Sequence, residues 1–148
     1  MRFITIVKSA ENVGPLPEEF MDAMARFREE NIKKGIVIDG NRLLPSEAGA
    51  RVRLTGRRLT VTDGPFVESK ELIGGYGIYD LKSKKEAIEL VLRFMQLLKE
   101  HWPGWEGETE IRQLSDESCA DGGNLREANR TTEGLQRPNP HHLARGTL

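Results

Sequence analysis

Apolar residues recur along the first part of the chain with two periods, one typical of strands and one typical of helices. Residues 2–8 are rich in β-branched and aromatic types, which predicts a buried strand. Further along, Phe20, Met24 and Phe27 stand at helical spacing, so these side chains share one face of a helix. We therefore expect an amphipathic helix over residues 17–34.

The middle of the chain has the pattern of several short strands. Residues 36–38 form a short apolar run that favours a strand, and the Asp-Gly-Asn sequence at 39–41 is typical of a turn. Residues 51–54 and 58–62 alternate charged or hydroxylated side chains with Val or Leu. That alternation predicts a β-hairpin with one face in water. We expect a further strand over 75–81.

A second helix begins with a capping signal. Ser83 and Glu86 match the capping box, in which the hydroxyl and the carboxylate satisfy unpaired backbone N–H groups reciprocally. A broad apolar stripe follows and stops near His101, which predicts a long helix buried on one side. We expect the last strand over 109–114.

The expected order is β-α-β-β-β-β-α-β, in which two helices can cover one face of an antiparallel sheet. We therefore predict an α+β fold with the ferredoxin-like arrangement. In the first strand, Ile4 and Ile6 share one face while Phe3 and Val7 share the other. Because both faces of this strand are apolar, we also expect a second subunit on the open face, and hence a homodimer.

The composition changes after this domain. Residues 116–148 are dominated by Gly, Asn, Arg, Thr, Pro and Asp, and apolar residues become rare. Such a segment buries too little apolar surface to offset its ordering entropy. We expect a folded domain over residues 1–115 and a flexible polar tail over 116–148.

Charge and cysteine content exclude several classes of protein. The formal net charge is -1, so no global field attracts nucleic acid or an anionic membrane. The single cysteine, Cys119, cannot form an internal disulfide, and no apolar run reaches the length of a membrane span. We expect a cytoplasmic protein. His101, His141 and His142 are the only imidazoles, and two of them fall in the expected tail, so neither a metal site nor a cofactor is expected.

Candidate chemistry is concentrated between residues 63 and 76. Asp63 follows a predicted strand and precedes Gly-Pro. Its carboxylate can serve as a general acid/base or bind a ligand at the mouth of a cleft. It can equally cap backbone N–H groups in an Asx-turn, and from the residue alone the turn is favoured.

Other residues of this stretch also have two interpretations. Glu68 and Lys70 share a face of an extended segment, where each can shift the other's pKa or simply form a solvated salt bridge. Gly74 and Gly75 either admit a ligand close to the backbone or mark a bulge. We expect the phenol of Tyr76 to present its hydroxyl to a pocket.

The run Asp-Gly-Pro-Phe-Val-Glu-Ser-Lys-Glu at 63–71, followed by Gly-Gly-Tyr at 74–76, resembles the signature of the YCII-related proteins, specifically their DGPF-domain branch. The resemblance extends over residues 1–114. It implies a ferredoxin-like fold, a dimer of the α/β-barrel kind and a catalytic role for an acidic residue in a cleft. It also implies, for some members, association with extracytoplasmic-function sigma factors. The His-Asp pair of the broader group is not transferred, because His101 is the only histidine in the expected domain.

These observations lead to two main hypotheses. The first is a small dimeric enzyme that acts on a small organic molecule, with Asp63 as acid/base and Glu68 and Lys70 as supporting charges. Its expected ligand contacts are Pro65, Phe66, Gly74, Gly75 and Tyr76. The second is a non-catalytic ligand-binding or regulatory module that works with a sigma factor. A third interpretation makes the motif a purely structural loop.

Overall fold

The computed structural model describes residues 1–66 and 71–116. Its strands are β1 (Arg2–Ser9), β2 (Val37–Arg42), β3 (Ala50–Thr55), β4 (Arg58–Asp63), β5 (Leu72–Asp80) and β6 (Gly107–Gln113), and its helices are α1 (Glu18–Lys33) and α2 (Lys84–His101). A short 3-10 helix covers Ser46–Ala48. Contacts divide the chain after Leu114, and of the tail expected over 116–148 all residues from 117 onward lie outside the described residues.

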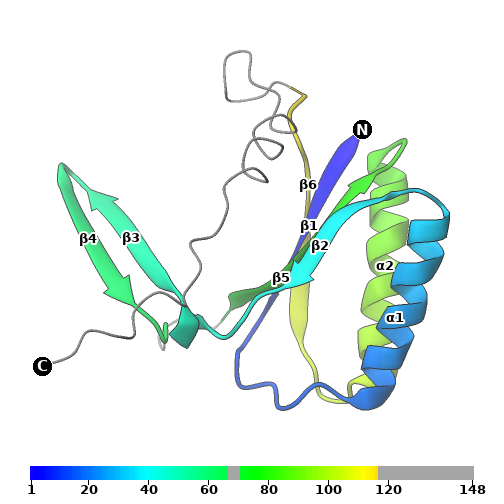
Figure 1. Cartoon of the computed structure of the whole chain (residues 1–148), viewed down its shortest axis with the longest axis horizontal. Coiled ribbons are helices and arrows are strands. Elements are labelled where there is room, and N and C mark those ends of the chain that lie inside the picture. The colour runs from blue at the N-terminus through cyan, green and yellow to red at the C-terminus, as the bar shows by residue number, and fades with distance from the viewer. Residues whose placement is uncertain (67–70, 117–148) are drawn as a thin grey trace, which may run out of the picture. The chain divides into compact units, whose positions relative to one another are not determined.

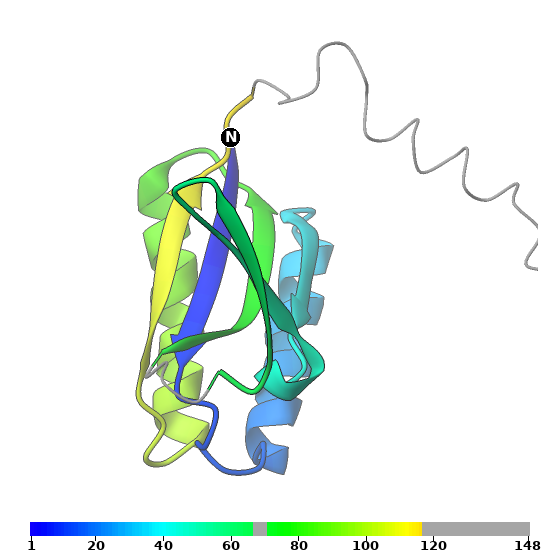
Figure 2. The same cartoon turned by 90° about the vertical axis from the view of Figure 1, so that its left-hand side faces the viewer.

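Four strands form one antiparallel sheet in the order β2-β5-β1-β6. Both helices lie on the same side of this sheet (Figures 1 and 2). This order, with helices between the first and second and between the third and fourth sheet strands, is the ferredoxin-like arrangement. The predicted α+β fold is confirmed. Strands β3 and β4 form a separate two-stranded hairpin inserted between β2 and β5.

The core lies between the sheet and the two helices. Phe3 of β1 is only 2% exposed and packs with Phe27 of α1 and Leu90 of α2. A second cluster at the other end of the helices joins Phe20, Leu98 and Trp102. Alternation along β1 therefore directs Phe3 to the helices, while its neighbour Ile4 lies on the open face and is half-buried.

The capping box predicted at the start of α2 is present in the structure. The Ser83 hydroxyl accepts a hydrogen bond from the Glu86 backbone N–H at 3.2 Å. The Glu86 carboxylate accepts from the backbone N–H of Lys82, one residue before the cap, at 2.9 Å. Two backbone donors that the helix leaves unpaired are thus satisfied, and α2 starts at a defined position.

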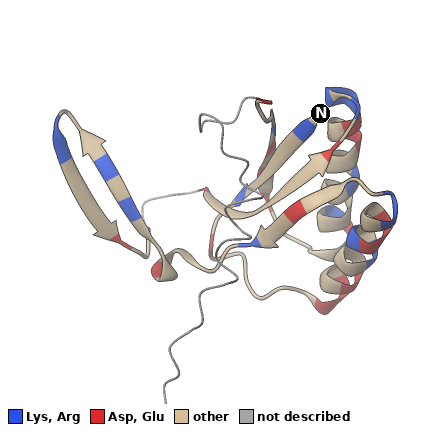
Figure 3. Ribbon diagram, turned by 45° about the horizontal axis from the view of Figure 1, so that its top comes forward, with Lys and Arg blue, Asp and Glu red and all other residues tan. Residues whose placement is uncertain are grey.

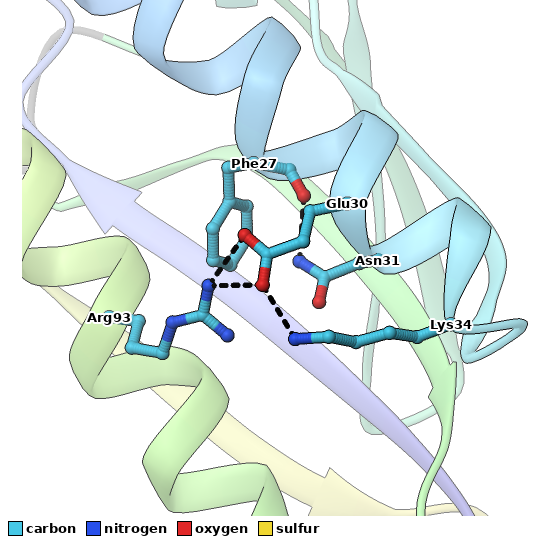
Figure 4. A network of polar contacts seen from close by, with 5 residues as sticks. All are labelled: Phe27, Glu30, Asn31, Lys34 and Arg93. Carbon is cyan, nitrogen blue, oxygen red and sulfur yellow. Dashed lines mark hydrogen bonds and ion pairs between the residues drawn. The ribbon is translucent and has the colours of Figure 1, made fainter.

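An ionic contact joins the two helices on their outer surface. The Arg93 guanidinium on α2 donates to both carboxylate oxygens of Glu30 on α1, at 3.0 and 2.9 Å, and Lys34 donates to the same carboxylate at 2.6 Å (Figure 4). The hydrogen bond from Lys34 and then the bond from Arg93 lower the pKa of the Glu30 carboxyl. These groups are exposed, so the contact orients the helices more than it stabilises them.

The turn predicted at 39–41 is wrong, because these residues belong to β2. Gly40 pairs with Gly77 of β5, and a Cβ atom at Gly40 would lie 3.0 Å from the carbonyl oxygen of Tyr76. The Asp39 carboxylate accepts a hydrogen bond from the Gly40 N–H at 2.8 Å, a local contact common in turns. The strand nevertheless continues, with a register shift between Val37 and Asp39. Strand pairing to β5 therefore overrides the local turn preference.

The hairpin differs from the sheet in having no cover within the described residues. All twelve residues of β3 and β4 are exposed. Val52 pairs with Val61 and Leu54 with Leu59, so these four side chains share one face. Basic residues of the hairpin lie along β3 and at the turn (Figure 3). The hairpin is confirmed, but both of its faces, rather than one, are exposed in a single chain.

Candidate functional site

A cavity of about 700 Å³ lies between the helix-facing side of the sheet and helices α1 and α2. We call it the sheet–helix cavity. Its wall is mainly apolar and includes Leu16, Phe20, Met24, Leu90, Phe94 and Leu98. Residues 9–16 and 42–45 border it where β1 and β2 end. A large apolar hollow with a few polar groups is the usual form of a small-molecule site.

Glycines in β5 create the space for this cavity. Gly75 and Gly77 pair with Val7 and Thr5 of β1, so they occupy two successive helix-facing positions without side chains. The aromatic ring of Tyr79 lies over Gly77, since a Cβ atom there would come within 2.6 Å of that ring. The floor of the cavity is therefore backbone covered in part by one tyrosine ring.

Tyr79 and Arg28 bring polar groups to the cavity wall. Burial raises the pKa of the Tyr79 hydroxyl, and the positive charge of Arg28 opposes this shift only in part. The phenol therefore stays protonated at neutral pH and can donate a hydrogen bond. The Arg28 guanidinium donates to the carbonyl oxygen of Gly40 at 3.1 Å, which holds its charge beside the edge strand β2.

Two buried polar residues also line the cavity. The Thr5 hydroxyl donates to the carbonyl oxygen of Gly77 at 3.3 Å. The Asn31 side-chain N–H donates to the carbonyl oxygen of Phe27 at 2.8 Å, while its oxygen has no partner among the described residues. These two residues thus give the wall two engaged donors and one acceptor without a partner among the described residues.

Ser46 connects the cavity rim to the motif at the base of the hairpin. Both its backbone N–H and its hydroxyl donate to the carboxylate of Glu11, which lines the cavity, and the hydroxyl contact is 2.7 Å long. The Ser46 hydroxyl in turn accepts from the Phe66 N–H at 2.9 Å. The ring of Phe66 lies 3.9 Å beneath the Arg51 guanidinium. The Asp-Gly-Pro-Phe motif therefore holds the rim in place through a single buried serine.

The structure separates the predicted site residues into two groups. Gly74, Gly75 and Tyr76 are among the residues that line the cavity. The Tyr76 hydroxyl, however, donates to Asp39 at 3.0 Å, and Tyr76 pairs with Ile6 on the face of the sheet away from the helices. This bond first, then the charge of Asp39 and burial, raise the pKa of the Tyr76 hydroxyl.

The remaining predicted residues that the structure describes lie apart from the cavity. Asp63 and Pro65 are exposed and Phe66 is half-buried at the hairpin base, and none of the three lines the cavity. Glu68 and Lys70, predicted as supporting charges, lie outside the described residues. The geometry thus brings the glycine step to the cavity but not the acidic residue of the motif.

Sequence reasoning missed the polar residues of the cavity wall, although one of them carried a signal. Asn31 follows Phe27 by four positions, so this amide side chain lies on the same face of α1 as the apolar stripe. A polar side chain on such a stripe indicates a buried group that needs a partner. The roles of Glu11 and Ser46 had no local signal, because their contact depends on the fold.

Neither a cluster of metal ligands nor a membrane-spanning helix is found in the part of the chain that the structure describes. Within it, no group of three or more His, Cys, Asp or Glu side chains is placed to hold a metal ion. No helix in residues 1–66 or 71–116 is both long and apolar enough to cross a membrane.

Sequence comparisons agree with this fold. Residues 1–94 match the model of the YCII-related domain. A protein of Rhizobium meliloti (strain 1021), named "Uncharacterized protein R00369", is 30% identical over 98 residues, which are 66% of this chain and 75% of the relative. The matched range contains both sides of the sheet–helix cavity, from β1 through most of α2.

Proposed function

The chain belongs to the YCII-related domain family, and we propose that it binds a small organic molecule in the sheet–helix cavity, most of whose lining residues lie within the matched residues 1–94. The observation that carries the proposal is the cavity itself. Its volume of about 700 Å³ lies within the range of about 300–1,000 Å³ typical of ligand pockets. Its mainly apolar wall suits a molecule whose body is apolar.

A variant that adds a bulky side chain at the cavity wall tests this proposal. A Cβ atom at Gly74 would have no contact closer than 4.0 Å, and its nearest neighbour is the Ser9 hydroxyl, so Gly74→Leu adds a side chain at the cavity wall without backbone clash. Glu89→Leu adds the same side chain on the exposed surface of α2 and is the matched control. A thermal-shift and native mass-spectrometry screen of small alcohols, acids, amines and aromatic compounds is run on all three proteins.

We expect ligands that stabilise the wild type and Glu89→Leu and fail to stabilise Gly74→Leu. Ligands that act equally on all three proteins bind elsewhere and contradict the proposal. A complete absence of ligands contradicts it as well.

Acid–base catalysis by Asp63, with Glu68 and Lys70 in support, is the second candidate. It is favoured by the hydrogen bonds through Ser46 that join the motif to the cavity rim, and by the motif's resemblance to the DGPF branch. Ligands from the screen are incubated with the wild type and with Asp63→Asn, and products are sought by mass spectrometry. Conversion of a ligand by the wild type alone supports catalysis by Asp63. Conversion by both proteins shows that the reaction does not require the Asp63 carboxylate.

Assembly into a homodimer is part of this proposal. The hairpin face formed by Val52, Leu54, Leu59 and Val61 is exposed, with each side chain 66–70% accessible. An isolated two-stranded hairpin is marginally stable in water, so such a face is expected to be covered. The open face of the sheet carries half-buried isoleucines, which a second copy of the chain can cover in turn.

Charge placed on the hairpin tests the assembly. We expect the wild type to sediment as a dimer at micromolar concentration and the double variant Leu54→Lys, Leu59→Lys to sediment as a monomer. The control is Thr60→Lys, because Thr60 pairs with Arg53 on the opposite face of the hairpin. A wild type that stays monomeric overturns the homodimer and leaves the hairpin face for another partner, of which a sigma factor is the first to test.

A further inference from the structure

The side-chain oxygen of Asn31 is a buried acceptor without a donor. Asn31 is 1% exposed, and Oδ1 has no hydrogen-bond partner among the described residues. Its amide nitrogen is turned toward the carbonyl oxygen of Phe27, and the oxygen is directed away from that carbonyl (Figure 4). Buried polar groups are nearly always paired, so this exception requires a physical reason.

The hydrogen bond to Phe27 determines which end of the amide faces outward. Phe27 offers a carbonyl oxygen, which only accepts, so the amide nitrogen must be the atom beside it. Exchanging the two ends would place two acceptors against each other. The backbone of α1 thus holds the Asn31 amide with an acceptor, and not a donor, pointing away from its own helix turn.

Asn31 is one of the residues that line the sheet–helix cavity, and its Oδ1 is itself almost fully covered in the unliganded chain, so a ligand reaches it only if the immediate neighbours of that atom move. Wall residues such as Met24, Leu90 and Phe94 are apolar and cannot donate to it, and neither Tyr79 nor Arg28, the polar groups named above, does so. The Thr5 hydroxyl already donates to the Gly77 carbonyl oxygen. A ligand in the cavity can therefore supply the missing donor.

We propose that Asn31 Oδ1 accepts a hydrogen bond from a hydroxyl or N–H group of the ligand. The cavity then selects small, mainly apolar organic molecules that carry such a donor over isosteric molecules that lack one. This inference rests on the proposed function, since it assigns a ligand class to the same cavity. A ligand without the donor leaves the acceptor unpaired and so binds more weakly.

Two compounds of similar size test the selection: 1-naphthol, which has a hydroxyl, and 1-methylnaphthalene, which has a methyl group at the same position. Their affinities are measured by calorimetry for the wild type, for Asn31→Leu, and for Glu89→Leu as the surface control. We expect the wild type and the control to bind 1-naphthol about tenfold more tightly than 1-methylnaphthalene. In Asn31→Leu we expect that ratio to fall to about one, because the acceptor is gone.

The outcomes separate this inference from the proposed function. Equal affinities for the two compounds in the wild type overturn the role of Asn31 and leave the binding function standing. A ratio that persists in Asn31→Leu overturns it too. If the wild type binds neither these compounds nor any member of the ligand screen, the binding function fails and this inference fails with it. The wild-type comparison decides the matter even if Asn31→Leu does not fold.

Discussion

Two strand regions of this protein have the same strand period and opposite surroundings. In β1 the apolar residue Phe3 is 2% exposed beneath the helices, whereas Val52, in a strand of the hairpin, is 70% exposed. Phe3 shares its face of β1 with Val7, and Val52 shares its face of the hairpin with Leu54. Alternation therefore determines which residues share a face, and it leaves open whether anything covers that face.

The difference follows from what is connected to each strand. The strand β1 pairs on both sides, and the helices that follow β1 and β5 in the chain fold back onto its sheet. The strands β3 and β4 pair only with each other in the described residues, and no helix lies between them. Cover for the hairpin must come from outside the part of the chain that the structure describes.

Truncating one leucine in each region gives the largest expected contrast. Leu98 is 3% exposed in the core, so Leu98→Ala should lower the free energy of unfolding by about 3 kcal/mol. Leu54 is 66% exposed, so Leu54→Ala should cost less than about 0.5 kcal/mol in the monomer. Urea denaturation at low protein concentration measures both values. Equal losses would show that the hairpin face is covered even in a single chain.

The junction between the regions should depend on one glycine. A Cβ atom at Gly64 would overlap the backbone carbonyl oxygen of Ser46, whereas one at Gly49 would lie 3.5 Å from the same atom. Gly64→Ala should therefore lower the free energy of unfolding by about 2 kcal/mol, because the hairpin base must shift. Gly49→Ala is the control and should change it little. Similar values for both variants would mean that the hairpin base adapts freely.

The helix that covers the sheet should be sensitive to its cap. Ser83→Ala removes the side-chain acceptor at the start of α2 and should cost about 1 kcal/mol of unfolding free energy. The hairpin counterpart is Thr60→Ala, which removes an exposed hydroxyl from β4 and should cost less. Thermal unfolding of the two variants compares them. A larger effect at Thr60 would contradict the view that the hairpin contributes little to the folding of the sheet and helices.

The smallest expected effect is a change in acid sensitivity on the open face of the sheet. A hydrogen bond from Lys8, and then one from Arg112, lowers the pKa of the Glu110 carboxyl. Because the folded pKa lies below the unfolded value, this stabilisation is present above the unfolded pKa and is lost as the pH falls through the folded one. Glu110→Gln should flatten the dependence of stability on pH in that acidic window, as measured by thermal unfolding between pH 3 and pH 7.

Lys8→Met provides the matched test of the same contact. Since Lys8 supplies the first of the two hydrogen bonds, its removal should flatten the same acidic window. The double variant should add little to either single change, because the two residues share one interaction. Full additivity would mean that the pH dependence arises at other carboxyl groups.

The order of helices and strands was predicted correctly, whereas the local signal at 39–41 and the lining of the cavity depend on distant partners that the sequence pattern does not show. The cap at Ser83 and the hairpin turn at Gly56, which has a φ of 62°, follow from neighbouring residues alone. The Asp39-Gly40 step has turn chemistry but lies in a strand, because pairing with β5 overrides it. Among the candidate ligand contacts, Gly74 and Gly75 line the cavity in the structure. Asn31 was not singled out from the sequence, because it is one polar residue in an apolar stripe.

By itself, the sequence determined the type and order of the elements and the residues that share each face, because helix and strand periods are local properties of the chain. Only the tertiary structure decided which faces are covered and where a hollow forms. The sheet–helix cavity brings Asn31 of α1 together with Gly77 of β5, residues that no local pattern relates. Its volume and its unpaired acceptor arise from how layers pack, and packing depends on contacts between segments far apart in the chain.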